Sequence, residues 1–336
     1  MHATRAAQDT LTRWRWQMIP GAQWRLIPAC AHAVLHRGAR HGLQPIETIG
    51  DDPELSAWTI GTGIRHAYLL HYGGNPARLA YQRMQLPHLG VNTTIVTAYD
   101  KQDIDDSVRQ CHALCDPANR GIYRALSNET SICDAAHAAR LSASLKLYVA
   151  LFDMAWRGYP AALILEDDVK ILWHRLDALG AAVRNTSVAP DPERLTVLFS
   201  SSYAANGDDA LRHGVHLRPN NRFGNGLMPA VGVVVTAAGA HHLLQSLPIT
   251  DNNDALLSDR RGPAARQPGL WYSKPYTFVP ASELQHECMA ALEDPSRHCR
   301  APGLAGRAVV PSPRPVTGTG MHPRSSRLVN ASLRPA

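Results

Sequence analysis

The sequence predicts an α/β fold in which helices flank a mainly parallel β-sheet. Apolar runs rich in β-branched residues recur along the chain, segments with helical periodicity separate them, and Gly, Pro or Asn lies at the junctions. The chain has 336 residues, of which 45% are hydrophobic. That is enough apolar material to bury the core of one large domain.

The first predicted strand–helix unit begins at residue 64. The apolar run IRHAYLLH (64–71) indicates a buried strand, which the breakers in YGGNP end. Pro76 suits the first turn of a helix and Asn75 suits its N-cap, so a helix is predicted over ARLAYQRMQL (77–86). The β-branched run NTTIVTAY (92–99) then predicts a second strand.

The longest helical pattern, over residues 134–157, precedes the third strand. Its apolar positions follow a spacing of 4, 4, 3 and 4 residues, at Leu141, Leu145, Val149, Phe152 and Trp156. The run AALIL (161–165) predicts a short buried strand, and a helix is expected over 172–185. The pattern continues with two further strands and a helix, at RLTVLFSS (194–201), MPAVGVVV (228–235) and AAGAHHLLQSL (237–247).

The basic charge of the chain lies at its two ends. Residues 1–46 hold six Arg and one Asp, or +5, and residues 300–336 hold six Arg and no acid, or +6. Because the whole chain is +6, residues 47–299 carry −5. An acidic core lacks the charge that nucleic acids attract, so no nucleic-acid partner is expected.

These shifts in composition divide the chain into three parts. Residues 1–46 are predicted to be a basic extension, either a targeting segment or disordered, because Arg-rich, acid-poor ends are typical of transit peptides. Residues 47–299 form the single predicted folded domain, and residues 300–336, rich in Pro, Gly, Ser and Arg, a disordered tail. Membrane association is compatible with this sequence, but no transmembrane segment is predicted.

The cysteines favour disulfides over zinc. Two of them flank His112 at close spacing, but no second metal-spaced pair follows. We expect disulfides within the group at 111–133 and between the last two cysteines of the set, which comprises Cys30, Cys111, Cys115, Cys133, Cys288 and Cys299.

Glycosylation sequons point to the same compartment as the cysteines. Four Asn-X-Ser/Thr motifs exceed the roughly one expected by chance, and they begin at Asn92, Asn128, Asn185 and Asn330. We therefore expect a glycoprotein of the secretory pathway, in the lumen of the Golgi or the endoplasmic reticulum. Organellar targeting by the Arg-rich N-terminus is the alternative.

Three adjacent acids, Glu166, Asp167 and Asp168, follow the third strand in ALILEDDVKIL. Adjacent carboxylates repel one another, and ligands of open α/β sheets bind beyond the carboxyl ends of strands. Successive strand residues point to opposite faces, so Glu166 and Asp168 are expected to share a face while Asp167 points away. Two such carboxylates suit Mg²⁺ or Mn²⁺. The alternative is that Asp167 or Asp168 caps the following helix.

The segment GYPAALILEDDV, after the helix LSASLKLYVALFDMAWR, resembles glycosyltransferase family 25 and its LPS-type relatives. The resemblance continues through NPAR, TAYDKQDI, GVVVTAAGAHHLL and LPITDNNDALL, in this order, and covers about residues 64–280. It implies a glycosyltransferase-A-like, Rossmann-like catalytic domain. The chain departs from the family at Lys146-Leu147, where bacterial members commonly have Ser-His, and at His71, where many have Asn.

The resemblance implies a metal-dependent hexosyltransferase of the inverting type, with a UDP-sugar as the expected donor and a hydroxyl of a glycan, glycoprotein or glycolipid as the acceptor. Mn²⁺ or Mg²⁺ would bind Glu166 and Asp168, with His286 completing the metal shell. Two other classes remain open from the residues alone: a metal-dependent hydrolase, and a catalytically inactive homologue that binds nucleotide.

The same resemblance suggests residues for the nucleotide and for the base. Arg78 and Lys146 are candidates to contact phosphate or nucleotide, and Asp100 to accept hydrogen bonds from uridine or ribose, with Asp167 placed in the same group. An inverting transfer needs a base for the acceptor hydroxyl. That base is predicted to be Asp254, with Asp251 as the substitute; the alternative is that these acids cap the helix that follows.

Overall fold

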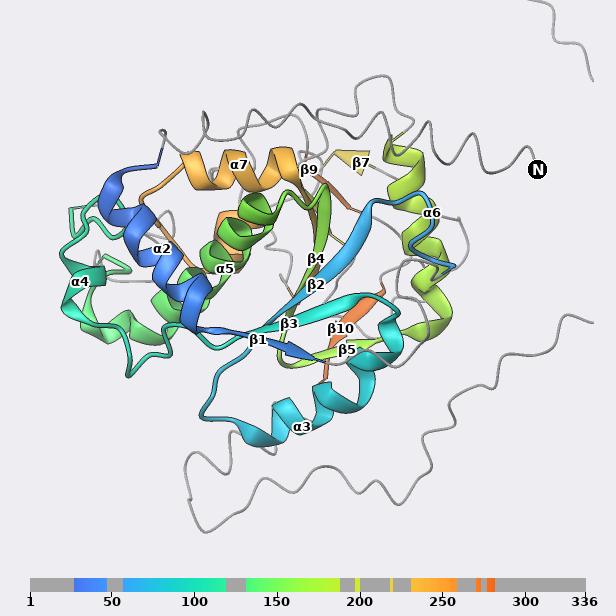
Figure 1. The fold of residues 1–336 in the computed structure, drawn as a ribbon, viewed down its shortest axis with the longest axis horizontal. Helices are drawn as coiled ribbons and strands as arrows, with labels where there is room; N and C mark the ends of the chain where they lie inside the picture. The colour runs from blue at the N-terminus through green and yellow to red at the C-terminus, as the bar shows by residue number, and fades with distance from the viewer. Residues whose placement is uncertain are drawn as a thin grey trace, which may run out of the picture. The chain divides into compact units, whose positions relative to one another are not determined.

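The computed structural model describes residues 27–46, 57–118, 131–187, 197–199, 218–219, 231–258, 270–272 and 277–281. They form an eight-stranded sheet with the order β1-β3-β2-β4-β8-β6-β9-β7 and a two-stranded sheet that pairs β10 with β5 (Figure 1). All described residues belong to one compact unit. The fold is therefore α/β, as predicted.

The strands are β1 (Leu43–Ile46), β2 (Ile64–Leu70), β3 (Asn92–Val96), β4 (Ala161–Glu166), β5 (Val169–Ile171), β6 (Val197–Phe199), β7 (Arg218–Pro219), β8 (Gly232–Thr236), β9 (Leu270–Tyr272) and β10 (Phe278–Pro280). The α-helices are α2 (Ala29–His41), α3 (Pro76–Gln85), α4 (Asp106–Arg109), α5 (Ala138–Arg157), α6 (Leu176–Ser187), α7 (Ala237–Gln245) and α8 (Asn253–Ser258). Short 3₁₀ turns are η3 (Leu86–Leu89), η4 (Ala135–His137) and η5 (Trp173–Arg175).

The strands and helices predicted from local patterns are found in the described part of the chain, with shifted ends. Pro76 is the first residue of α3, and the side chain of Asn75 accepts a hydrogen bond from the backbone N of Arg78 at 3.2 Å, as expected of an N-cap. Helix α5 ends at Arg157 and is followed by Gly158, whose φ of 72° is left-handed and so favours glycine. The predicted apolar stripe of α5 is buried except for Trp156, which is 55% exposed.

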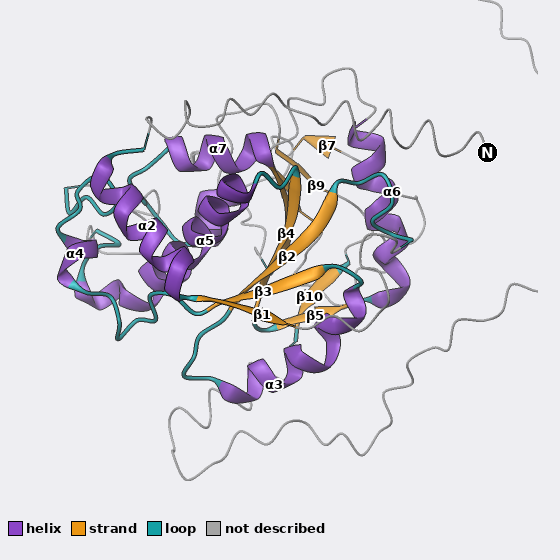
Figure 2. Cartoon of the chain, in the orientation of Figure 1, coloured by secondary structure: helices purple, strands orange, loops and turns teal. Residues whose placement is uncertain are grey.

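The sheet is buried on both faces because its strands alternate between two apolar clusters. In β4, Ala162 and Ile164 belong to the cluster that α2, α5, α7 and α8 cover. Leu163 and Leu165 of the same strand face the other cluster, which α6, η3 and β10 cover. Figure 2 shows these two helical layers on opposite sides of the strands. Burial on both faces explains why the central strands read as continuous apolar runs.

The expectation of a mainly parallel sheet holds for only part of the sheet. Strands β3, β2 and β4 are parallel, and so are β6 and β9. Strand β8 is antiparallel to both β4 and β6, and β1 is antiparallel to β3, so the described sheet is mixed. Burial on both faces gives the same apolar run in either direction, and the sequence pattern of β8 therefore did not reveal its orientation.

The chain reverses its direction of travel across the sheet at β2. From β2 it passes through α3 to β3 on one side, and from β3 it passes through α5 to β4 on the other side of β2. The two crossover connections run over opposite faces, since the residues that follow α3 pack into one cluster and α5 packs into the other. The carboxyl ends of β2 and β4 thus border a topological switch point, where open α/β sheets bind their ligands.

The fold begins earlier than the boundary at residue 47 predicted from composition. Helix α2 and strand β1 lie within residues 1–46, and β1 pairs with β3 from Leu43↔Val96 to Ile46↔Thr93. The buried face of α2 consists of Ala31, Val34, Leu35 and Gly38. These positions follow the helical spacing i, i+3, i+4, i+7, but the small residues among many His and Arg made the pattern inconspicuous.

Two disulfides fasten this N-terminal helix and the loops near α4. Cys30 is bonded to Cys111, and Cys115 to Cys133. The second bond lies within the predicted group, whereas the pairing of Cys111 with Cys30 was not foreseen; the predicted pair of Cys288 with Cys299 lies outside the described residues. By constraining the unfolded chain, each bond stabilises the fold by roughly 3–4 kcal/mol. Two disulfides are compatible with an oxidising secretory or extracellular environment.

A buried polar network lies between β2 and α5, in the part of β2 before its carboxyl end. Tyr68 donates a hydrogen bond to Asp153 at 2.7 Å, and Nε2 of the neighbouring His66 lies 3.0 Å from the hydroxyl of Thr94. The ring of His66 stacks on Tyr159. Burial lowers the pKa of His66 to about 4, although the charge of Asp153 opposes this shift.

His66 should therefore make the fold sensitive to mild acid. Its folded pKa is below the unfolded value of 6.5, so the unfolded chain binds the proton more readily, and stability is lost as pH falls from 6.5 towards 4. We expect His66→Phe, which keeps an aromatic ring, to reduce the stability difference between pH 7 and pH 4.5 by up to about 2.5 kcal/mol in urea unfolding. An unchanged pH dependence in this variant would show that His66 does not titrate on unfolding.

Candidate functional site

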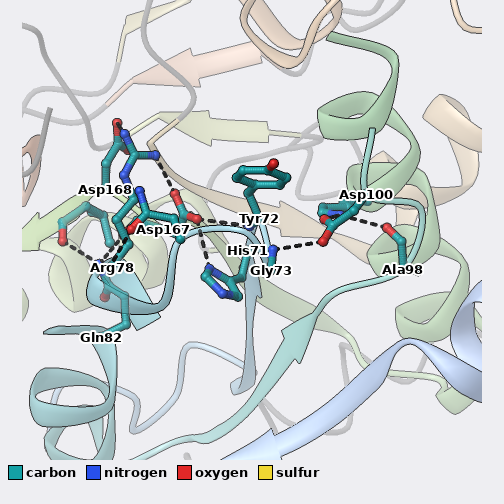
Figure 3. Close-up of polar contacts among 12 residues, drawn as sticks. His71, Tyr72, Gly73, Arg78, Gln82, Ala98, Asp100, Asp167 and Asp168 are labelled. Atoms are coloured by element: carbon teal, nitrogen blue, oxygen red, sulfur yellow. Dashed lines mark hydrogen bonds and ion pairs between the residues drawn. The ribbon is translucent and has the colours of Figure 1, made fainter. Parts of the chain in front are cut away.

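The carboxylate of Asp167 binds three donors at the end of β2. Its Oδ1 accepts a hydrogen bond from Nη1 of Arg78 at 2.8 Å, and its Oδ2 lies 2.9 Å from Nδ1 of His71 and 3.0 Å from the backbone N of Tyr72. Asp167 is 5% exposed. The middle acid of the triplet is thus turned into the protein, where it ties the turn after β4 to the end of β2 and to α3 (Figure 3).

A second buried ion pair, formed by Asp100 and Lys146, lies on the other side of residues 71–73. Asp100, which follows β3, accepts a hydrogen bond from the backbone N of Gly73 at 2.9 Å and from Nζ of Lys146 at 2.5 Å. The ammonium group of Lys146 also donates to the carbonyl of Ala98 at 2.9 Å. Lys146 belongs to α5, so this pair joins β2, β3 and α5.

The segment His71–Gly73 therefore lies between two buried carboxylates, as Figure 3 shows. Its strand pairing ends with a bond from the backbone N of His71 to the carbonyl of Val96. The next two backbone N–H groups, of Tyr72 and Gly73, are satisfied by acids from the two neighbouring strands. A Cβ atom on Gly73 would lie 2.7 Å from Oδ2 of Asp100, so only glycine permits this approach.

Two glutamines of α3 hold the backbone that follows the triplet. Nε2 of Gln82 donates to the carbonyls of Asp167 and Val169, both at 2.9 Å. Gln85 donates to the carbonyl of Val169 at 2.8 Å and accepts from the backbone N of Ile171 at 3.3 Å. Both side chains are buried, so the turn after β4 is fixed by side chains that the protein interior holds in place.

Burial shifts the pKa values of the buried charged groups, and hydrogen bonds and neighbouring charges oppose these shifts. Burial alone would raise the pKa of Asp167, but the hydrogen bond from His71 and the charge of Arg78 hold that pKa below its ordinary value. Burial opposes the charge of Arg78, yet the carboxylates of Asp167, Asp168 and Glu166 raise its pKa. Burial lowers the pKa of Lys146, and its hydrogen bond to Asp100 opposes this shift.

The outer two acids of the triplet lie closer to the surface than the middle one. Glu166 and Asp168 are partly exposed, whereas Asp167 is buried. Nη2 of Arg78 lies 4.0 Å from Oδ2 of Asp168. The backbone carbonyl of Asp168 accepts a hydrogen bond from the N of Ala281, which fixes this residue from the side of β10.

The segment predicted to supply the base meets the triplet through a residue that was not predicted. Nδ2 of Asn253 lies 3.4 Å from Oε1 of Glu166. Asp251 is 8% exposed and accepts a hydrogen bond from the backbone N of Asn252 at 2.9 Å. The backbone of Asp254 lies in α8, but its side chain is outside the described part of the structure.

The residues present fit a divalent cation only in part. Among the residues that the structure describes, no three His, Cys, Asp or Glu side chains gather closely enough to hold a metal ion. His286, which was expected to complete the shell, lies outside the described residues. Glu166 and Asp168 offer two carboxylates, and Mg²⁺ in particular takes one or two carboxylates together with substrate phosphates and water. The pair therefore suits a cation that arrives with a phosphorylated substrate.

The structure brings most of the predicted residues to one edge of the sheet, where several of them already have partners inside the protein. Arg78 and Lys146 were expected to contact a nucleotide, and both are held by buried carboxylates. His71, Gln82 and Gln85 were not predicted, although all three are buried and polar in the sequence neighbourhood of the first strand and helix. Gln82 and Gln85 are one helical turn apart, but glutamine is mostly exposed in proteins, and the sequence does not show that these two are buried. The sequence pattern therefore could not identify them.

Comparison with known proteins leaves the chain without an identified family. No protein-family model matches it, and no curated protein is a significant match. Within the described ranges, no helix combines the length and the apolar character needed to cross a membrane.

The pair of Lys146 and Asp100 should contribute more to stability than an exposed ion pair does. Lys146→Met leaves the carboxylate of Asp100 buried without its cation, which we expect to cost about 3–5 kcal/mol of unfolding free energy. Adding Asp100→Asn removes the buried charge and should recover part of this loss, with a coupling of at least about 1 kcal/mol. Urea unfolding of the two single variants and the double variant measures the coupling.

The matched control is Lys101→Met, the same change at an exposed position. Nζ of Lys101 lies 5.3 Å from the centre of the Tyr72 ring, a contact whose loss should cost less than about 1 kcal/mol. Equal losses in the two lysine variants, or strictly additive losses in the double variant, would contradict the buried pair.

Proposed function

We propose that this chain is a metal-dependent glycosyltransferase that moves a sugar from a nucleoside-diphosphate donor, with UDP-sugars as the first to test, to a hydroxyl of a glycan, glycoprotein or glycolipid. The observation that carries this proposal is the position of Glu166 and Asp168 at the carboxyl end of β4. They flank Asp167, whose own carboxylate is engaged inside the protein. This end of β4 borders the switch point of the sheet, a preferred place for ligands in open α/β folds.

The chemistry of such a donor matches the residues at this edge. A nucleoside diphosphate is a poor leaving group until the charge on its phosphates is neutralised. Glu166 and Asp168 would hold Mn²⁺ or Mg²⁺ together with the two phosphates, and the bound cation would supply Lewis-acid stabilisation of the leaving group. The guanidinium of Arg78, beside Asp168 and 22% exposed, adds a donor that suits a phosphate oxygen.

The internal bonds of the site support catalysis by keeping its parts in place. Asp167 fixes the turn that carries Glu166 and Asp168, and Gln82 fixes the carbonyl of Asp167 at 2.9 Å. Groups that are already oriented lose little freedom when the substrate binds. Lys146 and Asp100 act on the neighbouring segment in the same way, as positioning residues.

The base that accepts the proton of the acceptor hydroxyl is proposed to be Asp254, with Asp251 as the substitute. Asn253, next to Asp254 in the chain, contacts Glu166, so the segment that carries both acids adjoins the triplet. An inverting transfer needs a base on the side of the sugar opposite to the leaving diphosphate.

Calorimetric titration with UDP, with and without Mn²⁺, followed by assays of donor hydrolysis and sugar transfer, tests the proposal. A transferase should bind UDP more tightly with Mn²⁺ and release the sugar fastest when an acceptor hydroxyl is present. Rapid hydrolysis that no acceptor changes would indicate a metal-dependent hydrolase. Binding of UDP without turnover of any donor would indicate an inactive nucleotide-binding protein.

Asp168→Asn should lower sugar transfer by at least about a hundredfold, near 2.7 kcal/mol of activation free energy, because one of the two metal-binding carboxylates is lost. The fold should remain, since the side chain of Asp168 lies near the surface. The matched control is Asp177→Asn in the first turn of α6, an exposed acid away from the triplet. Full activity in metal-free buffer, in wild type or variant, would refute the metal role.

Asp254→Asn should lower turnover by about two to four orders of magnitude and leave UDP affinity unchanged. A base acts on the proton of the acceptor in the transition state and need not touch the nucleotide. Transfer rates and calorimetry with UDP measure the two effects, and Asp251→Asn is the variant to compare. If transfer survives in Asp254→Asn and stability falls by about 0.5 kcal/mol, Asp254 instead stabilises the first turn of α8 through the helix dipole.

A further inference from the structure

The amide of Asn253 is buried beside the triplet, and its carbonyl oxygen is unpaired among the residues that the structure describes. Its side chain is 3% exposed, and its Nδ2 lies 3.4 Å from Oε1 of Glu166. Its Oδ1 is buried and has no hydrogen-bond partner among the described residues. Buried amide oxygens in proteins are nearly always paired, because an unpaired one has lost its bonds to water without replacement.

The backbone of the segment that carries Asn253 is held by hydrogen bonds to other parts of the fold. The hydroxyl of Ser144 in α5 donates to the carbonyl of Asp251 at 2.8 Å. The backbone N of Ile249 donates to the carbonyl of Leu114 at 2.8 Å. These bonds attach the segment before α8 to two other parts of the fold, which makes its geometry independent of Glu166.

The contact with Glu166 determines which end of the Asn253 amide is left without a partner. A carboxylate only accepts hydrogen bonds, so the NH₂ group of Asn253 must face Glu166 and the carbonyl oxygen must point elsewhere. That oxygen is an acceptor. Its missing partner is therefore a hydrogen-bond donor, such as a hydroxyl group, or a cation, and not a phosphate oxygen.

We infer that Oδ1 of Asn253 accepts a hydrogen bond from a hydroxyl of the donor sugar, which makes Asn253 a specificity-determining residue for that sugar. The inference rests on the proposed function. Glu166 is one of the two carboxylates assigned to the cation and diphosphate, and Asn253 is its immediate neighbour. In a nucleoside-diphosphate sugar, the group attached to the outer phosphate is the sugar, which is rich in hydroxyl donors.

Binding of UDP and of UDP-sugars to the full chain separates the role of Asn253 from that of the diphosphate site. The probes are UDP, UDP-glucose, UDP-galactose and UDP-N-acetylglucosamine, titrated by calorimetry with Mn²⁺ present. Asn253→Ala should weaken the tightest-binding UDP-sugar by about tenfold, the worth of one good hydrogen bond, and change UDP affinity by less than about twofold. The same variant should also reduce the differences in binding affinity among the three UDP-sugars.

A second variant tests whether Asn253 serves the fold instead. Asn253→Leu keeps the side-chain volume and removes the unpaired oxygen, so the melting temperature of the ligand-free protein should stay the same or rise. The matched control is Gln245→Leu at the exposed end of α7. A melting temperature several degrees lower in Asn253→Leu than in the control would mark Asn253 as structural and overturn the inference.

The outcomes also distinguish the inference from the function on which it rests. If wild type binds UDP with Mn²⁺ but Asn253→Ala weakens UDP and UDP-sugars equally or not at all, the inference is wrong and the proposed function stands. If wild type binds neither UDP nor any of the UDP-sugars, the inference and the assignment of UDP-sugars as donors are both wrong.

Discussion

The end of strand β2 depends on two buried carboxylates, and the arrangement around the candidate site follows from them. When the chain leaves the sheet after His71, the backbone N–H groups of Tyr72 and Gly73 lose their strand partners inside the protein. Asp167 satisfies the first and Asp100 the second. A buried carboxylate in turn needs a cation, since an unpaired charge in the interior is very unfavourable. Arg78 and Lys146 meet this need from two different helices.

This constraint assigns different tasks to three adjacent acids. Asp167 stabilises the fold through bonds that hold β2, β4 and α3 together. Its two neighbours in the chain, Glu166 and Asp168, are partly exposed. Repulsion among the three is relieved because the middle charge is paired with Arg78, whose pKa the whole triplet raises. Because Asp167 is held rigidly, it can support a site that must present the carboxylates of Glu166 and Asp168 in a fixed geometry. The proposed glycosyl transfer uses this geometry.

Other parts of the fold stabilise the same edge from a distance. Helix α5 carries Lys146 to Asp100 and Ser144 to the carbonyl of Asp251, so one helix positions two segments of the site. The disulfide between Cys30 and Cys111 joins α2, which packs in the same cluster as α5, to the loop after α4. Reducing conditions would remove that link, and an oxidising compartment therefore suits this fold.

The sequence by itself determined the local elements and the candidate triplet. Apolar periodicity and β-branched runs identified β2, β3, β4, α3 and α5, because these patterns follow from burial of one face or both faces of a short segment. Position alone identified Glu166, Asp167 and Asp168 as acids at a strand end. Tertiary structure decided what pairs with what: His71 meets Asp167 across 96 residues of sequence, and Cys30 meets Cys111 across 81. It also decided the antiparallel direction of β8 and the place of α2 in the fold. Local patterns report burial, whereas partners and strand directions depend on how distant segments pack, and no single stretch of sequence contains that information.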